Sequence, residues 1–275
     1  MLKKSSFILT ATLVMVFVFP LGLMAPAQAA PPGPLPEQAG LYAVPGHPNL
    51  MLRVFVYHGK PDGVGNGKPA PFVPTLVCQS TTVVDQDSTA VVPGAGWTLP
   101  SAWTYNLNLA SVPSSVGSTN LVTVADNGFN AWLGVNDVNA AVNITRGSDT
   151  SITRAQRDYQ NIITWGRTSG SALATTYIWY DTTTHEAVEI DTIMNKKFTW
   201  YWSNPSTWPA NQTCAYSGVY DAQNILTHEL GHTFGLDDTY TSAYVNNTMY
   251  GSGSKGETKK NTLTTGDANG VAALY

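Results

Sequence analysis

Two histidines and a glutamate stand close together in residues 227–238, which read Thr-His-Glu-Leu-Gly-His-Thr-Phe-Gly-Leu-Asp-Asp. On a helix, His228 and His232 are one turn apart on the same face, so both imidazoles can bind a single Zn²⁺. Glu229 follows the first histidine, and a carboxylate there can hold the metal-bound water and accept its proton. Gly235 can adopt a positive φ and end the helix, and the turn would bring Asp238 to the metal as a third ligand. Two imidazoles and one carboxylate leave a fourth position open for water, which is typical of catalytic zinc sites.

The sequence around this motif favours a helix. Asp221 is a candidate N-cap, and apolar residues follow at four-residue spacing at positions 222, 226, 230 and 234. The bare pattern H-E-x-x-H also arises by chance on surface helices. The longer pattern, which includes Gly235 and Asp238, is far more restrictive, and we therefore predict a metal site.

The composition limits the classes of function. Only 12% of the 275 residues are charged, and the formal net charge is −4. Beyond the N-terminus, basic residues cluster only as the pairs Lys196-Lys197 and Lys259-Lys260. This distribution argues against nucleic-acid binding.

The first 29 residues have the pattern of a signal peptide. Lys3 and Lys4 precede an apolar run over 8–23, and Ala27-Gln28-Ala29 forms an A-x-A cleavage site. The alternative is a membrane anchor, but Pro and Gly residues interrupt the run and the cleavage site follows it directly. We therefore expect a secreted, extracellular protein that is monomeric and has no membrane contact after removal of the signal.

The chain has two cysteines, Cys78 and Cys214. In an oxidising compartment the default is one disulfide between them. The alternative is that the thiolate of Cys78 caps the zinc in a latent form, although residues 75–80 lack the Pro-Arg-Cys-Gly context of known cysteine switches.

Strands are expected before two late helices, which predicts an α+β fold. Residues 119–133, the motif segment and residues 264–274 have helical patterns. Residues 30–95 are interpreted as an N-terminal extension or propeptide, and residues 96–275 as the main domain. The expected strands cover residues 49–58, 103–109, 140–144, 161–165, 174–181 and 187–195.

Three segments in this order resemble the metzincin clan of zinc endopeptidases, and within it the matrixins. The first is the motif at 228–238. The second is Asn247-Thr248-Met249-Tyr250, which is similar to a Met-turn with Met249 as its methionine. The third is residues 263–275, similar to the closing helix of matrixins, L-x-x-x-D-x-x-G-x-x-x-L-Y. The resemblance implies a catalytic domain over 96–275 with a twisted mixed β-sheet, an active-site helix, a Met-turn and a C-terminal helix.

Asp238 departs from most matrixins, which have a third histidine there, and is similar to the aspartate of snapalysin-type enzymes. A carboxylate adds negative charge to the site, which makes the zinc a weaker Lewis acid than three imidazoles would. Asp237 is the neighbouring candidate, but the spacing from His232 favours Asp238.

The resemblance implies a zinc metalloendopeptidase that cleaves protein or peptide substrates through a metal-activated water, with Glu229 as general base. The strand at 187–195 is similar to the matrixin edge strand, so substrate is expected to pair along it. The loop at 251–263 is expected to shape the pocket for the residue after the cut. Matrixins often carry calcium, so Ca²⁺ is a second metal that the resemblance implies, although no calcium-binding loop is recognisable.

Two alternatives remain open from the sequence. One is a secreted, non-catalytic binding module that keeps zinc as a structural element, which would have no need of Glu229. The other is a latent zymogen in which residues 30–95 block the cleft.

Overall fold

A mixed β-sheet forms the framework of the protein in the computed structural model, which describes residues 34–60, 73–84 and 86–275. The predicted signal peptide lies outside the described residues. The strand order is β1-β2-β7-β8-β6-β4-β5, with β12 (Ser252–Gly253) paired to β2. The strands in this order are Gly40–Ala43, Leu50–Gly59, Ala172–Asp181, Ala187–Asn195, Ile162–Gly166, Ala102–Leu107 and Asn143–Arg146.

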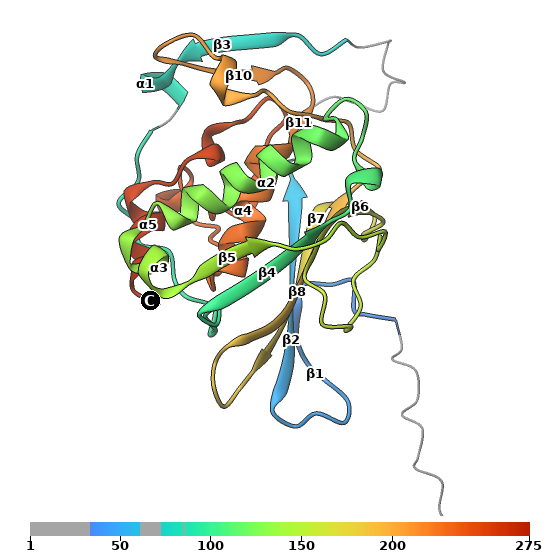
Figure 1. The fold of residues 1–275 in the computed structure, drawn as a ribbon. Coiled ribbons are helices and arrows are strands. Elements are labelled where there is room, and N and C mark those ends of the chain that lie inside the picture. Colours follow the sequence, from blue (N-terminus) through green and yellow to red (C-terminus); the bar gives the residue numbers. More distant parts are fainter. Residues whose placement is uncertain (1–33, 61–72, 85) are drawn as a thin grey trace, which may run out of the picture. The chain divides into compact units, whose positions relative to one another are not determined.

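The strand pairing changes from antiparallel to parallel at β8. The pairs from β1 to β8 are antiparallel, whereas β8, β6, β4 and β5 pair in parallel. Helices pack against this mixed sheet, so the predicted α+β fold with a twisted mixed sheet is confirmed (Figure 1).

Two strand predictions are wrong. Residues 140–144 do not form one strand, because α3 (Asn136–Ala141) ends within them and β5 begins at Asn143. The strand at 187–195 exists as β8, but it lies inside the sheet between β7 and β6 and is not an edge strand. All of its residues except Val188 are buried, as expected for a strand with neighbours on both sides. A substrate therefore cannot pair along β8, because its main-chain groups are already used.

Two helices back the sheet and hold the motif. α2 (Ser118–Leu133) packs against α4 (Ala222–Thr233), and α4 contacts β7 and β8. The helices approach closely at Gly128, where an added Cβ would lie 2.8 Å from a methyl carbon of Leu230. Trp132 Nε1 donates to the carbonyl of Thr227 at 2.9 Å, which fixes α2 beside the turn that carries the first histidine.

The remaining helices are short. α1 (Thr81–Val84) follows β3 (Leu76–Ser80), and α5 (Thr265–Ala272) is the last helix and has Thr264 as its N-cap. In the part of the chain that the structure describes, no helix has the length and apolar character that a membrane crossing needs. Single 3₁₀ turns occupy Leu109–Ser111, Pro205–Thr207, Ser242–Tyr244 and Lys259–Asn261.

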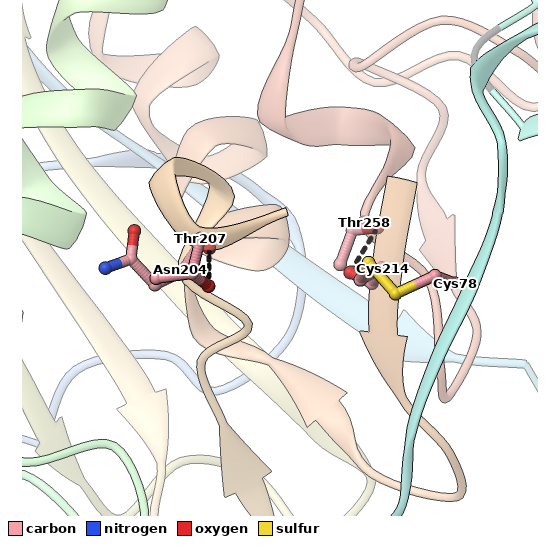
Figure 2. The surroundings of a disulfide bond; sticks show 5 residues. All are labelled: Cys78, Asn204, Thr207, Cys214 and Thr258. Carbon is pink, nitrogen blue, oxygen red and sulfur yellow. Dashed lines mark hydrogen bonds between the residues drawn. A yellow bond between two sulfur atoms is a disulfide. The ribbon is translucent and has the colours of Figure 1, made fainter. Parts of the chain in front are cut away.

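Two small ladders complete the fold. β9 (Trp200–Tyr201) pairs with β11 (Tyr220–Asp221), and β3 (Leu76–Ser80) pairs with β10 (Gln212–Tyr216). A disulfide joins Cys78 to Cys214 across the second ladder, and Thr258 donates to the carbonyl of Cys214 beside it (Figure 2). The sulfur of Cys78 is therefore not a free thiolate in this structure, and it is not part of the metal-binding cluster described below.

Candidate metal centre

The motif lies on a helix that is buried along its whole length. Asp221 caps α4 as predicted, because its carboxylate accepts from the main-chain N–H groups of Gln223 and Asn224, each at 3.0 Å. The other oxygen of Asp221 accepts from the N–H and hydroxyl of Ser203, each at 2.8 Å. These bonds fix the start of the helix that carries both histidines.

Gly235 turns the chain sharply after α4. Its φ is 94°, and an added Cβ would lie 2.2 Å from the carbonyl oxygen of Trp97. Only glycine fits both the dihedral angle and the space. The N–H of Leu236 then bonds back to the carbonyl of Gly231, which directs the chain toward Asp238.

Both histidines are held by main-chain carbonyls at Nδ1. His228 Nδ1 lies 2.7 Å from the oxygen of Thr248, and His232 Nδ1 lies 2.9 Å from that of Leu236. A carbonyl oxygen only accepts, so each Nδ1 carries the proton and each Nε2 presents a lone pair. Burial lowers the pKa of both imidazoles, that of His232 to about 4, and both are therefore neutral near pH 7.

One carboxylate oxygen of Asp238 lies close to the Nε2 atoms of both histidines. Its Oδ1 lies 3.2 Å from Nε2 of His228 and 3.6 Å from Nε2 of His232. None of these three atoms has a hydrogen-bond partner, although all are buried. Three acceptor atoms facing one another without a proton donor are costly unless a cation lies among them. Among the described residues, these side chains form the one group of histidine, cysteine and carboxylate ligands close enough to share an ion, within 4.8 Å of one another.

The donor set fits zinc. Two imidazole nitrogens and one carboxylate oxygen are common Zn²⁺ ligands, and hydrogen bonds from Nδ1 to carbonyls orient such histidines. Calcium prefers six to eight oxygens and does not suit this site.

Glu229 lies beside the cluster and is fully buried. Its Oε2 accepts from the hydroxyl of Thr176 at 2.6 Å, and its Oε1 has no partner. Burial raises the pKa of Glu229 to about 8. The carboxyl is thus fixed at one oxygen and free at the other.

Met249 supports the helix between the two histidines. It is fully buried, and its sulfur lies 2.1 Å from the place where a Cβ on Gly231 would be. The helix can approach the methionine this closely because residue 231 has no side chain. The neighbouring N–H groups of Thr248 and Met249 both donate to the buried carboxylate of Asp267 in α5, at 2.8 and 3.2 Å.

Two residues of the site were not identified from the sequence. Thr176 fixes Glu229, and Tyr240 donates to the second oxygen of Asp238 at 3.0 Å. Asp267, the aspartate of the closing-helix pattern, holds the turn at Met249, a role that the pattern did not indicate. The only sequence signal for Thr176 is the pair of threonines in an otherwise apolar strand. Asp237 lies outside the cluster and accepts from the guanidinium of Arg53 at 3.2 Å.

A comparison with family models identifies the protein family of this chain. The family model of the matrixin peptidases matches residues 96–275. The chain belongs to the matrixin family. A search of characterised proteins found no match.

Membership of the matrixins supports a metalloendopeptidase that acts on proteins or peptides, and it implies zinc binding. The matched range contains the centre and strands β4 to β8. It excludes β1 and β2, so β7 and β5 are the two outer strands of the sheet within the matrixin region.

Proposed function

We propose that this matrixin is a secreted zinc endopeptidase in which His228, His232 and Asp238 hold the metal and Glu229 is the general base. The observation that supports this most strongly is the convergence of three buried acceptor atoms that lack partners, next to a glutamate oxygen that also lacks one. A zinc ion bound there would supply a Lewis acid that polarises the scissile carbonyl and lowers the pKa of water.

Glu229 has the properties of a proton carrier. Thr176 fixes one carboxylate oxygen, and the other oxygen is buried without a partner on the residue that follows His228. Burial raises the pKa of Glu229 to about 8 in the absence of metal, and a cation bound beside the carboxyl would favour its ionised form, which can accept a proton. It would take a proton from the attacking water and deliver it to the leaving amine. A non-catalytic, zinc-stabilised module would leave the free oxygen of Glu229 without a role.

Substrate would bind as an extended strand on β7. Peptides add to sheet edges through main-chain hydrogen bonds, and β7 is the outer strand of the matrixin region that contacts the site, through the bond from Thr176 to Glu229. Residues 1–29 would direct export, residues 30–95 would be an N-terminal extension, and residues 96–275 would be the catalytic domain. Ca²⁺ remains an expectation from the family without a ligand set among the described residues.

Casein hydrolysis by the protein and by Glu229→Gln, with zinc measured in both, tests the catalytic assignment. We expect equal zinc and a loss of cleavage of at least about a hundredfold in the variant. Equal cleavage by both proteins would exclude Glu229 as the base.

Asp237 provides a matched control for the proposed third ligand, Asp238. Asp238→Asn should weaken zinc binding by about tenfold or more, whereas Asp237→Asn, one residue away, should leave the zinc affinity nearly unchanged. Zinc titrations of the metal-free proteins measure both affinities. The reverse ranking would move the ligand to Asp237.

A further inference from the structure

Basic side chains gather around a hollow at one end of the sheet. Strands β6 and β8 run parallel and stay paired as far as Gly166 and Asn195. Arg167 follows the first strand, and the lysine pair at 196 and 197 follows the second. The hollow has a volume of about 640 Å³, and no residue of the metal centre lines it. The residues that line this cationic hollow are Glu37, Arg167, Thr168, Asn195, Lys196 and Lys197.

Hydrogen bonds fix the main chain from which the lysines project. Asn195 is only 3% exposed, and its Nδ2 donates to the carbonyl of Ala172, the first residue of β7, at 2.7 Å. Its Oδ1 accepts the N–H of Lys197 at 3.0 Å. The N–H of Lys196 bonds to the carbonyl of Gly166 at 3.0 Å, so the ends of β8 and β6 are joined. The two lysines therefore leave the sheet from fixed points.

The cationic hollow has a net positive charge. Within residues 34–60, 73–84 and 86–275, Arg167, Lys196 and Lys197 form no salt bridge with a carboxylate. Glu37 is the one acidic residue in the lining. The chain as a whole has a formal net charge of −4, so the charge of this region is opposite to that of the protein. Such a region attracts anionic groups.

The surroundings favour the carboxylates of a peptide over a dense polyanion. Nucleic acid presents one negative charge about every 1.7 Å, which Glu37 and the acidic protein would repel. A peptide spaces its carboxylates between neutral groups, and its main-chain N–H groups can donate to Glu37 or to the hydroxyl of Thr168. The mixture of three cations, one anion and one hydroxyl thus suits an acidic peptide segment.

The cationic hollow lies beside the strand proposed for substrate binding. Asn195 contacts Ala172, and Thr176, which holds Glu229, is four residues further along β7. Four residues of a strand span about 13 Å. An acidic residue about four positions from the bond that is cut is therefore within reach of the hollow.

We propose that the cationic hollow is a second binding site, which holds an acidic segment of a protein substrate through the charges of Arg167, Lys196 and Lys197. The identity of the segment as part of a substrate rests on the proposed peptidase function. Binding of the carboxylates needs neither zinc nor cleavage, so it can be tested separately.

Peptide binding tests the site without activity. A dye-labelled peptide of four glutamates would be titrated at low ionic strength with the full chain after removal of residues 1–29, and fluorescence anisotropy would be followed. The same peptide with four glutamines is the neutral probe. We expect the glutamate peptide to bind about tenfold more tightly or better, and the difference to shrink as added salt screens the charges. Equal binding of the two peptides would overturn the proposal.

A charge-matched pair of variants locates the binding. Arg167→Gln with Lys196→Gln removes two of the three charges, and among the described residues neither side chain has a hydrogen bond or an ion pair to lose. Arg146→Gln with Arg157→Gln removes the same charge from residues that do not line the hollow. We expect the affinity for the glutamate peptide to fall about fivefold or more in the first variant and to stay nearly unchanged in the second. Equal losses in both would show that only the net charge matters and would overturn the proposal.

Glu37→Gln provides a test in the opposite direction. Because it removes the acidic residue of the lining, it should raise the affinity for the glutamate peptide by about twofold or more. A lower affinity in this variant would contradict binding in the cationic hollow.

A cleavage assay separates the site from the proposed function. Fluorogenic peptides with a flank of four glutamates or four glutamines would be given to the zinc-loaded parent and to Arg167→Gln with Lys196→Gln. We expect the KM of the glutamate peptides to rise about fivefold in the variant with kcat little changed, and the glutamine peptides to show no difference. Equal KM values for the glutamate peptides would overturn the assignment to substrate. If the glutamate peptide binds as expected but no zinc-loaded protein cleaves any peptide, the peptidase function fails while the anionic site stands.

Discussion

Replacing Asp267 by asparagine should destabilise the protein and loosen its metal centre. The carboxylate is fully buried in α5 and accepts four hydrogen bonds. Oδ2 receives the N–H of Thr248 at 2.8 Å, the N–H of Thr264 at 3.0 Å and the hydroxyl of Thr264 at 2.6 Å. Oδ1 receives the N–H of Met249 at 3.2 Å.

An asparagine side chain has one oxygen, which can keep the three bonds at the Oδ2 position. Its NH₂ group then faces the N–H of Met249, so one bond to a charged acceptor is lost and a buried donor is left unpaired. A lost bond of this kind costs about 1.5–3 kcal/mol, and the three remaining bonds become weaker because the acceptor is neutral. We therefore expect Asp267→Asn to lower the free energy of unfolding by about 3 kcal/mol.

Asp87 provides the matched control. Its exposed carboxylate also binds the start of α5, accepting from the N–H and hydroxyl of Thr265, each at 2.7 Å. Because water can replace these bonds, Asp87→Asn should lower the free energy of unfolding far less than Asp267→Asn does. Urea unfolding followed by circular dichroism measures both values.

Asp267→Asn should also weaken zinc binding, because Asp267 holds the N–H of Thr248 and the carbonyl of Thr248 orients His228. We expect zinc affinity to fall by about tenfold in Asp267→Asn and to stay unchanged in Asp87→Asn. Equal losses of stability in the two variants, or unchanged zinc affinity in Asp267→Asn, would refute the view that this carboxylate supports the centre.

Three further predictions concern the scaffold. Gly235→Ala should lower the free energy of unfolding, measured in urea, by about 2 kcal/mol or more. The new Cβ would clash with the carbonyl of Trp97, and alanine rarely adopts the positive φ of this residue. An unchanged free energy of unfolding would contradict the turn geometry. Burial raises the pKa of Asp191 from 3.8 to about 8, so the stability that its protonated form contributes is full below pH 3.8 and is lost as the pH rises to about 8. Asp191→Asn should therefore flatten the fall in Tm between about pH 4 and pH 8, and an unchanged slope would exclude this group as its source. Replacing both Cys78 and Cys214 by serine removes a cross-link between residues 136 positions apart. The free energy of unfolding should fall by up to about 5 kcal/mol relative to the oxidised parent, because the unfolded chain gains freedom. Equal stability of the two proteins would show that the disulfide does not restrict the unfolded chain.

The sequence predicts the parts of the site that depend on local chain geometry. The spacing of His228 and His232, the cap at Asp221 and the positive φ at Gly235 all follow from helix geometry, and the structure has each of them. The cluster with Asp238 lies within one helix and its following turn, so no long-range pairing was needed to predict it.

The errors and omissions concern contacts between distant segments. Strand β8 was expected at an edge, but its partners are set by residues far away in the chain, and period-two patterning does not name them. The strand at 49–58 was predicted correctly, yet nothing in its sequence indicates that it pairs with β7 or that Phe55 and Tyr57 lie on the histidines. Thr176 was missed for the same reason, because its bond to Glu229 joins residues 53 positions apart.

A zinc titration of peptide cleavage tests the central claim most directly. The metal-free parent would be assayed with increasing zinc, beside the protein carrying Glu229→Gln. We predict that cleavage rises up to one equivalent of zinc and then stops rising, and that the protein with Glu229→Gln binds the same equivalent without cleaving. Cleavage that does not depend on zinc, or zinc bound by the parent with no cleavage, would contradict a peptidase centred on His228, His232 and Asp238.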